Sequence, residues 1–179
     1  MGIGRRSIVF LFCFGGYEKR GDDKRMKIVD FLNEKAICAS LKATTKEGVI
    51  RELVDTLAKA EGIKNKEDLV KVLLNRETLG STGIGQGVGI PHGKTNAVKR
   101  LVSAFGICHD GVNFDALDGE PVYLFFLLVA PEDSAGPHLK GLARISRLLK
   151  DKFFRESLKQ MTDEKTILKL IREEDAKKP

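Results

Sequence analysis

The chain of 179 residues is 42% hydrophobic and 31% charged, and it carries a net charge of +6. Its length predicts a single domain with a core of its own, and its composition excludes a disordered or fibrous protein. Acidic residues are interleaved with the basic ones, so the charge indicates a solvated surface more than a nucleic-acid interface. The cysteines at positions 13, 38 and 108 show neither metal-ligand spacing nor a disulfide pattern. They fit small apolar residues in or near the core of a protein in a reducing compartment such as the cytoplasm.

The N-terminus differs in character from the rest of the chain. Arg5 and Arg6 precede a short apolar run over residues 7–14, which is similar to the start of a signal peptide. The run is far shorter than the ~20 residues that span a bilayer, and residues 15–20 offer a poor cleavage site. We expect residues 1–25 to be an extension, residues 26–175 to form the domain and residues 176–179 to form a polar tail. An export signal is the alternative for the extension.

Two helices are predicted in the first half of the domain. A short strand over residues 37–42 comes first, because polar and apolar side chains alternate there. Thr44 and Glu47 have the spacing of a capping box, and apolar residues then recur at helical spacing until Gly62. Asn65 is placed to cap a second helix, which should end between Arg76 and Leu79.

The second half predicts two strands followed by three helices. The strands cover residues 101–108 and 122–130, and the second is apolar enough to be buried on both faces. The pairs Asp110-Gly111 and Asp118-Gly119 are turn signals. Helices are expected over residues 137–149, 151–160 and 163–172, with a frayed end from residue 173 onward. Together these elements predict an α/β fold, a single domain with a mixed β-sheet sandwiched between helical layers.

Residues 80–89 contain five glycines, and they match neither common nucleotide-binding motif. The glycines occur at every second position from residue 83 to 89, whereas a dinucleotide fingerprint needs G-x-G-x-x-G. Gly93-Lys94-Thr95 resembles the end of a P-loop, but position 88 is Val where that motif needs Gly. A strand over residues 87–90 fits better, with another backbone close to its glycines. Pro91 would then end the strand and His92 would project at the rim of the sheet.

The three histidines differ in their surroundings. His92 lies between Pro91 and Gly93, and Arg76, Ser81, Thr82 and Gly83 are close to it in sequence. A neutral imidazole can attack phosphorus, while guanidinium, hydroxyl and N–H groups bind the oxygens. His138 falls in the first turn of a predicted helix, where its pKa would be lowered, and it is either a second imidazole of the site or a capping residue. His109 fits a structural role. No Cys or carboxylate completes a metal site, and no serine has a nucleophile-elbow context.

Four motifs together resemble a known family. They are Asn75-Arg76-Glu77-Thr78, Ser81-Thr82-Gly83-Ile84-Gly85, Gly89-Ile90-Pro91-His92-Gly93, and His138-Leu139 before an amphipathic helix. In this combination they are similar to the enzyme IIA domain, fructose/mannitol type, of the bacterial phosphoenolpyruvate-dependent sugar phosphotransferase system. The resemblance runs from about residue 28 to residue 172. One departure is Gly89, where the family often has alanine, and a looser strand is expected there.

The resemblance implies a phosphotransferase that needs no cofactor and no metal. The phosphocarrier HPr would donate a phosphoryl group to His92, with His138 and Arg76 beside it and Ser81, Thr82 and Gly83 binding phosphate. The group would pass to an enzyme IIB domain of a membrane sugar transporter, without nucleic acid or direct membrane insertion. The alternative is a nitrogen-related regulatory IIA protein, whose phosphorylation state controls partner binding. Local acidic groups such as Glu77 are expected to influence docking more than net charge does.

Overall fold

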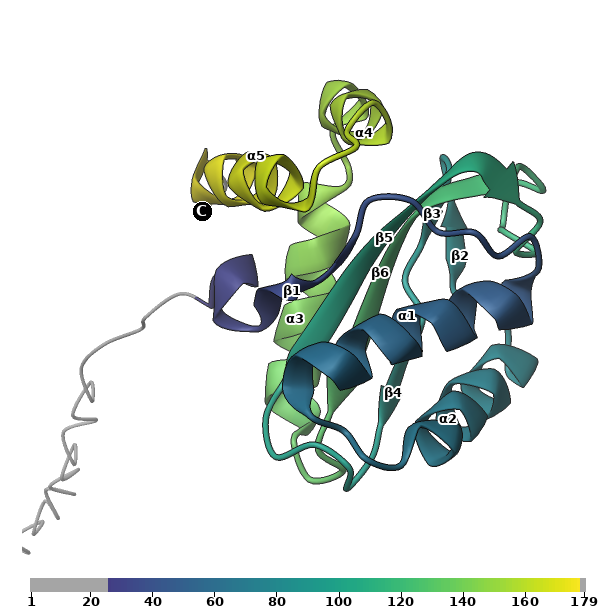
Figure 1. Ribbon diagram of the computed structural model, residues 1–179, viewed down its shortest axis with the longest axis vertical. Coiled ribbons are helices and arrows are strands. Elements are labelled where there is room, and N and C mark those ends of the chain that lie inside the picture. The colour runs from purple at the N-terminus through teal and green to yellow at the C-terminus, as the bar shows by residue number, and fades with distance from the viewer. Residues whose placement is uncertain (1–25, 178–179) are drawn as a thin grey trace, which may run out of the picture.

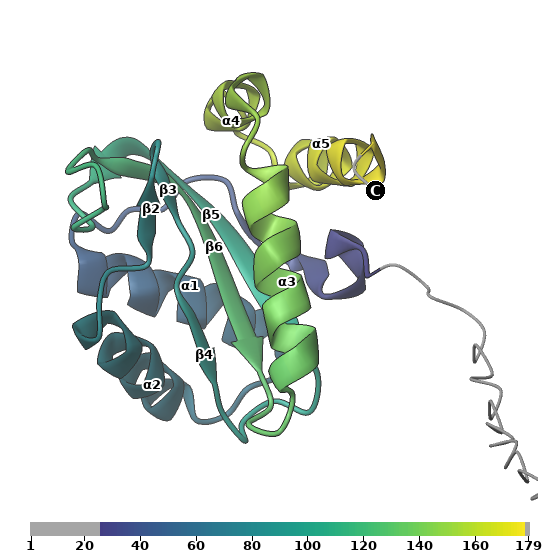
Figure 2. The ribbon, with the colours of Figure 1, turned by 180° about the vertical axis from the view of Figure 1, so that it is seen from behind.

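The structure of the protein is a computed structural model, which describes residues 26–177. A six-stranded sheet lies between two layers of helices, as Figures 1 and 2 show from opposite sides. The helices α1 (Lys46–Glu61) and α2 (Lys66–Thr78) cover one face. The other face carries α3 (Ala135–Leu148), with α4 (Lys152–Lys159) and α5 (Glu164–Lys177) beside it. The predicted α/β sandwich is thereby confirmed.

The strand β6 (Val122–Ala130) organises the sheet. It pairs antiparallel with β5 (Val102–Val112), which pairs parallel with β1 (Leu32–Cys38). On its other side β6 pairs parallel with β3 (Val88–Gly89) and then with β4 (His92–Lys94), and β3 pairs antiparallel with β2 (Gly83–Gly85). A single turn of 3-10 helix, η1 (Ile28–Asp30), precedes β1.

The apolar run of β6 divides between two cores. Phe125, Leu127 and Val129 belong to the core under α1 and α2, whereas Leu124, Phe126 and Leu128 belong to the core under α3, α4 and α5. Alternate residues of a strand point to opposite faces, so a strand covered on both sides is apolar throughout. Cys108 is buried in the first core and Cys38 packs against it, as expected, while Cys13 lies outside the described residues.

Several predicted boundaries are wrong, because tertiary contacts decide them. The first strand is Leu32–Cys38 rather than 37–42, and its middle is charged and exposed, as is common at a sheet edge. The N-terminal cap of α1 is Thr45, not Thr44, and its side chain accepts a hydrogen bond from the Gly48 amide. The caps at Gly62 and Asn65 are confirmed.

Two further predictions fail in the second half of the chain. Asp110-Gly111 is not a turn but part of β5, where the pairing with β6 shifts register and Gly111 has a φ of 73°. The last helix does not fray from residue 173 but continues to Lys177. Asp175 is buried there, bound by the Arg144 side chain at 2.6 Å and by the Ile28 amide at 2.9 Å.

The glycine-rich segment forms the predicted strand, but the close contacts differ from the expectation. A Cβ atom at Gly89 would lie 3.0 Å from the Phe125 ring, so the glycine makes room for a side chain. The close approach of a backbone occurs at Gly83, where a Cβ atom would lie 2.8 Å from the Cα of Ala116. The loop that contains Ala116 is therefore pressed directly onto β2.

We predict that Gly83→Ala lowers the free energy of unfolding by roughly 2–3 kcal/mol, because the added methyl group overlaps backbone atoms. Gly119→Ala is the matched control. Gly119 has open space around it but a φ of 73°, so alanine there meets only the backbone cost of about 1 kcal/mol. Urea unfolding of both variants gives the comparison, and a Gly83 variant as stable as the Gly119 variant would contradict it.

Candidate functional site

A pocket of about 360 Å³ lies at the free edge of β4, between the end of α2 and the start of α3. Its lining combines apolar and basic side chains with two of the three histidines. The residues that line it are Val72, Asn75, Arg76, Leu79, His92, Gly93, Lys94 and His138. The fold thus brings together His92, His138 and Arg76, which the sequence analysis singled out.

The hydrogen bonds of His92 fix its tautomer. Its Nδ1 lies 2.8 Å from the carbonyl oxygen of Ile90, and a carbonyl can only accept. In the neutral ring Nδ1 therefore carries the proton, and Nε2 keeps its lone pair. Nε2 accepts a hydrogen bond from the Nε–H of Arg76 at 3.3 Å. The nucleophilic nitrogen is consequently held in the pocket beside a guanidinium.

The surroundings of His92 favour its neutral form. Burial is the largest influence and lowers the pKa of His92, and the charge of Arg76 lowers it further. The hydrogen bond to Ile90 and the carboxylate of Glu77 act in the opposite direction, but the net shift is downward. The lowered pKa thus favours the neutral ring, in which Nε2 is unprotonated, at neutral pH.

His138 packs next to His92, with ring centroids 5.6 Å apart. It is 7% exposed, and its Nε2 is buried without a hydrogen-bond partner among the described residues. Its pKa is lowered to about 4, mainly by burial and then by the charges of His92 and Lys94. The lowered pKa agrees with the expectation, although burial rather than the helix terminus is the main cause. His109 lies outside the pocket. Its Nε2 forms a hydrogen bond with the Ala39 carbonyl oxygen at 2.9 Å.

Arg76 is held in place by the end of α2. One of its terminal nitrogens donates to the carbonyl oxygen of Gly80 at 2.9 Å, while its Nε reaches His92. Gly80 has a φ of 138°, so the chain leaves the helix there by a path that suits glycine. The guanidinium is therefore fixed, with further N–H donors available to an anion in the pocket.

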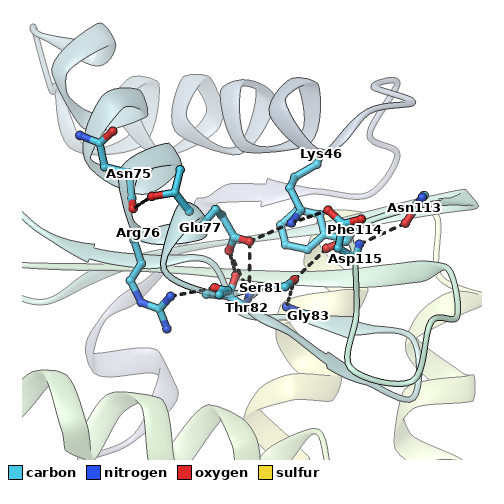
Figure 3. A network of polar contacts seen from close by, with 12 residues as sticks. Lys46, Asn75, Arg76, Glu77, Ser81, Thr82, Gly83, Asn113, Phe114 and Asp115 are labelled. Carbon is cyan, nitrogen blue, oxygen red and sulfur yellow. Dashed lines mark hydrogen bonds and ion pairs between the residues drawn. The ribbon is translucent and has the colours of Figure 1, made fainter.

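Ser81, Thr82 and Gly83 do not line this pocket, and their polar groups are engaged elsewhere. The Ser81 hydroxyl donates to the carbonyl of Phe114 and accepts from the Gly83 amide. The hydroxyl and amide of Thr82 both donate to Glu77 (Figure 3). Their contacts attach the loop to α2 and to residues 113–115, and phosphate binding by these three residues stays a prediction.

Glu77 anchors this network and is not available for docking. Its side chain is buried, it accepts from Thr82, and it pairs with Lys46 of α1 at 3.1 Å (Figure 3). Lys46 also pairs with Asp115 at 3.0 Å and lies over the Phe114 ring. The expectation that Glu77 acts in docking is therefore wrong, because the carboxylate points away from the pocket into a structural ion pair.

The sequence analysis did not assign Lys94, Val72, Asn75 or Leu79 to the site, although all four line the pocket. Strand periodicity would have found Lys94, because residues two apart in a strand share a face and His92 is two residues before it. Val72, Asn75 and Arg76 of α2, with Leu79 directly after its end, follow helical spacing along one stripe. No group of His, Cys, Asp and Glu within residues 26–177 has the arrangement of a metal site.

Comparisons with known proteins identify relatives of this chain. A 38% identical relative over 146 residues is a nitrogen regulatory protein of Bradyrhizobium diazoefficiens, with 82% of this chain and 95% of that protein covered. The fructose-specific EIIABC component of Bacillus subtilis is 38% identical over 150 residues, which is 84% of this chain but 24% of that protein. This chain thus spans about a quarter of the latter relative.

Solved structures show the same fold. The crystal structure of nitrogen regulatory protein IIA-Ntr from Neisseria meningitidis has a TM-score of 0.74 and 34% identity, covering 80% of this chain and 98% of that one. The enzyme IIAMTL of Escherichia coli, solved in complex with phosphorylated enzyme IIBMTL, has a TM-score of 0.66 and 26% identity, covering 79% and 98%. Residues 30–174 match the family described as phosphoenolpyruvate-dependent sugar phosphotransferase system, EIIA 2. The chain belongs to this family of phosphotransferase components.

Proposed function

We propose that this protein is a cytoplasmic phosphoryl carrier, which accepts a phosphoryl group on His92 from HPr and passes it to an enzyme IIB domain. The observation that carries the proposal is the hydrogen bond between His92 Nδ1 and the Ile90 carbonyl, which leaves Nε2 as the unprotonated ring nitrogen in the pocket. No helix within residues 26–177 is long and apolar enough to cross a membrane.

The reaction needs only groups that the pocket holds. The lone pair of Nε2 forms the new P–N bond while the N–P bond of the donor breaks, and its electron pair returns to the donor imidazole. No net proton transfer is required. The Arg76 guanidinium donates a hydrogen bond to the Nε2 lone pair before the reaction, and it gives up that bond for the phosphoryl oxygens as the P–N bond forms. The unpartnered Nε2 of His138 is a second group that can hydrogen-bond them.

The surface around the pocket suits a protein donor and acceptor. Leu79 at the end of α2 is 82% exposed and Leu139 beside His138 is 65% exposed. Exposed apolar side chains on both sides of a reactive group are typical of a protein contact face. The Escherichia coli relative was solved in complex with phosphorylated enzyme IIB, which supports a IIB domain as the acceptor.

A regulatory role is the second candidate. It is favoured by the similarity to nitrogen regulatory proteins from Bradyrhizobium diazoefficiens and Neisseria meningitidis over nearly their whole length. Incubation of the phosphorylated protein with a fructose-type IIB domain separates the two roles. Loss of the phosphoryl group to IIB supports transport, whereas retention of the group supports regulation.

We predict that wild-type protein gains one acid-labile phosphoryl group after incubation with phosphoenolpyruvate, enzyme I and HPr, and that His92→Ala gains none. Intact mass spectrometry measures the gain. His109→Ala is the matched control, since this histidine lies outside the pocket and should leave phosphorylation unchanged. A gain on His92→Ala, or none on wild type, would reject the assignment.

The neutral state of His138 has a consequence for stability. Its pKa is about 4 in the folded protein, against 6.5 for an unperturbed histidine. Between these values the unfolded chain binds a proton that the folded protein does not bind. Stability therefore falls as the pH decreases from 6.5 toward 4, and above 6.5 this residue adds no pH dependence.

We predict that lowering the pH from 7 to 5 destabilises wild type by about 2 kcal/mol more than it destabilises His138→Gln, which removes the titrating group. Urea unfolding of both proteins at the two pH values measures the difference. His92 titrates in both proteins, and because its charge contributes to the lowered pKa of His138, the difference reports the two neighbouring histidines together. Equal losses in the two proteins would show that the His138 pKa is not lowered by folding.

A further inference from the structure

The pocket has an excess of positive charge that its own side chains do not balance. Arg76 and Lys94 both line it, whereas no Asp or Glu does. Glu77, which follows Arg76 in α2, is bound to Lys46 and Thr82. The two histidines of the lining, His92 and His138, are neutral imidazoles. Cations gathered at a partly buried site without an acidic partner favour an anion there.

The position of Lys94 in the sheet directs it to this pocket. Residues 92–94 form β4, in register with residues 128–130 of β6, so His92 and Lys94 lie on the same face of the strand. Gly93 between them packs on α2, where a Cβ atom would lie 2.9 Å from Val72. The alternation is therefore fixed by packing, and it places the lysine two residues beyond the nucleophile.

Lys94 differs from an ordinary surface lysine in its surroundings. Its side chain is half-buried, and within residues 26–177 it makes no hydrogen bond or ion pair. Its charge reaches His138 and contributes to the lowered pKa of that residue. A cation that disfavours protonation of its neighbour and has no counter-ion is stabilised when an anion enters the pocket.

We propose that Lys94 is a further phosphate-binding residue, whose ammonium group contacts the phosphoryl group on His92. This inference rests on the proposed function of His92. The ammonium group keeps its protons and forms only charge-assisted hydrogen bonds, so the bonds made and broken in the transfer are unchanged. Arg76 then binds the phosphoryl oxygens from the α2 side and Lys94 from the strand.

Gly93-Lys94-Thr95 resembles the end of a P-loop in sequence but not in structure. A P-loop lysine follows a glycine loop and precedes a helix, whereas Lys94 lies in a short edge strand. The shared feature is limited to a lysine that approaches phosphate. The ligand in this case is a protein-bound phosphoryl group and not a nucleotide.

The test is a ³¹P NMR titration of the phosphorylated protein, loaded chemically with phosphoramidate so that loading does not depend on HPr. A nearby cation lowers the pKa of the phosphoryl group, so in Lys94→Met that pKa should rise by about one unit. Lys94→Arg should keep the wild-type value. Lys99→Met is the control, since Lys99 is exposed and lies outside the pocket.

The rate of phosphoryl acceptance from phospho-HPr gives a second measurement. Lys94→Met should accept about tenfold more slowly, and Lys94→Arg and Lys99→Met at close to the wild-type rate. The same phosphoryl pKa in Lys94→Met and wild type would overturn the proposal. If phosphoramidate modifies wild type but phospho-HPr does not, the proposed function fails and the NMR result still decides the role of Lys94. Lys94→Gln provides the same comparison if Lys94→Met does not fold.

Discussion

The burial of β6 on both faces is the constraint on which the rest of the structure depends. Its apolar side chains must be covered from two sides, so α1 and α2 are needed on one face and α3 on the other. β4 is held against the end of β6 and has a free outer edge. The end of α2 and the first turn of α3 consequently meet around that edge. His92 is placed there by its register opposite Leu128 rather than by a loop of its own.

The charged side chains of this region are divided between a structural network and the pocket. Glu77 and Arg76 are adjacent in α2, yet the carboxylate turns to Lys46 and the guanidinium turns to His92. Neighbouring residues of a helix point about 100° apart, so the last turn of α2 can direct Glu77 into the network and Arg76 into the pocket. Glu77 and Asp115 both bind Lys46 in this network, which fixes the glycine-rich loop. The pocket is left with cations and neutral imidazoles, which is the charge state that a phosphoryl group requires.

Sequence patterns predicted those parts of the protein whose signals are local. The two-sided burial of β6, the cap at Asn65 and the convergence of His92 with Arg76 follow from apolar runs, capping chemistry and motif spacing. Sequence patterns did not predict the features that depend on partners distant in the chain. Glu77 looked like an exposed acid because nothing near it in sequence indicates the ion pair with Lys46. Asp175 lies in a polar stretch, and only the folded chain brings Arg144 to it.

A carrier must release the phosphoryl group as readily as it accepts it, and the pocket is built in a way that meets both needs. His92 and Lys94 are only half-buried, so their attraction for the group is moderated by solvent. His138 is buried and neutral, and its unpartnered Nε2 can hydrogen-bond without a permanent charge. A deeply buried cation in its place would bind the dianion too strongly for onward transfer. The lowered pKa of His138 keeps the ring uncharged at neutral pH, and the same shift makes the protein less stable at acidic pH.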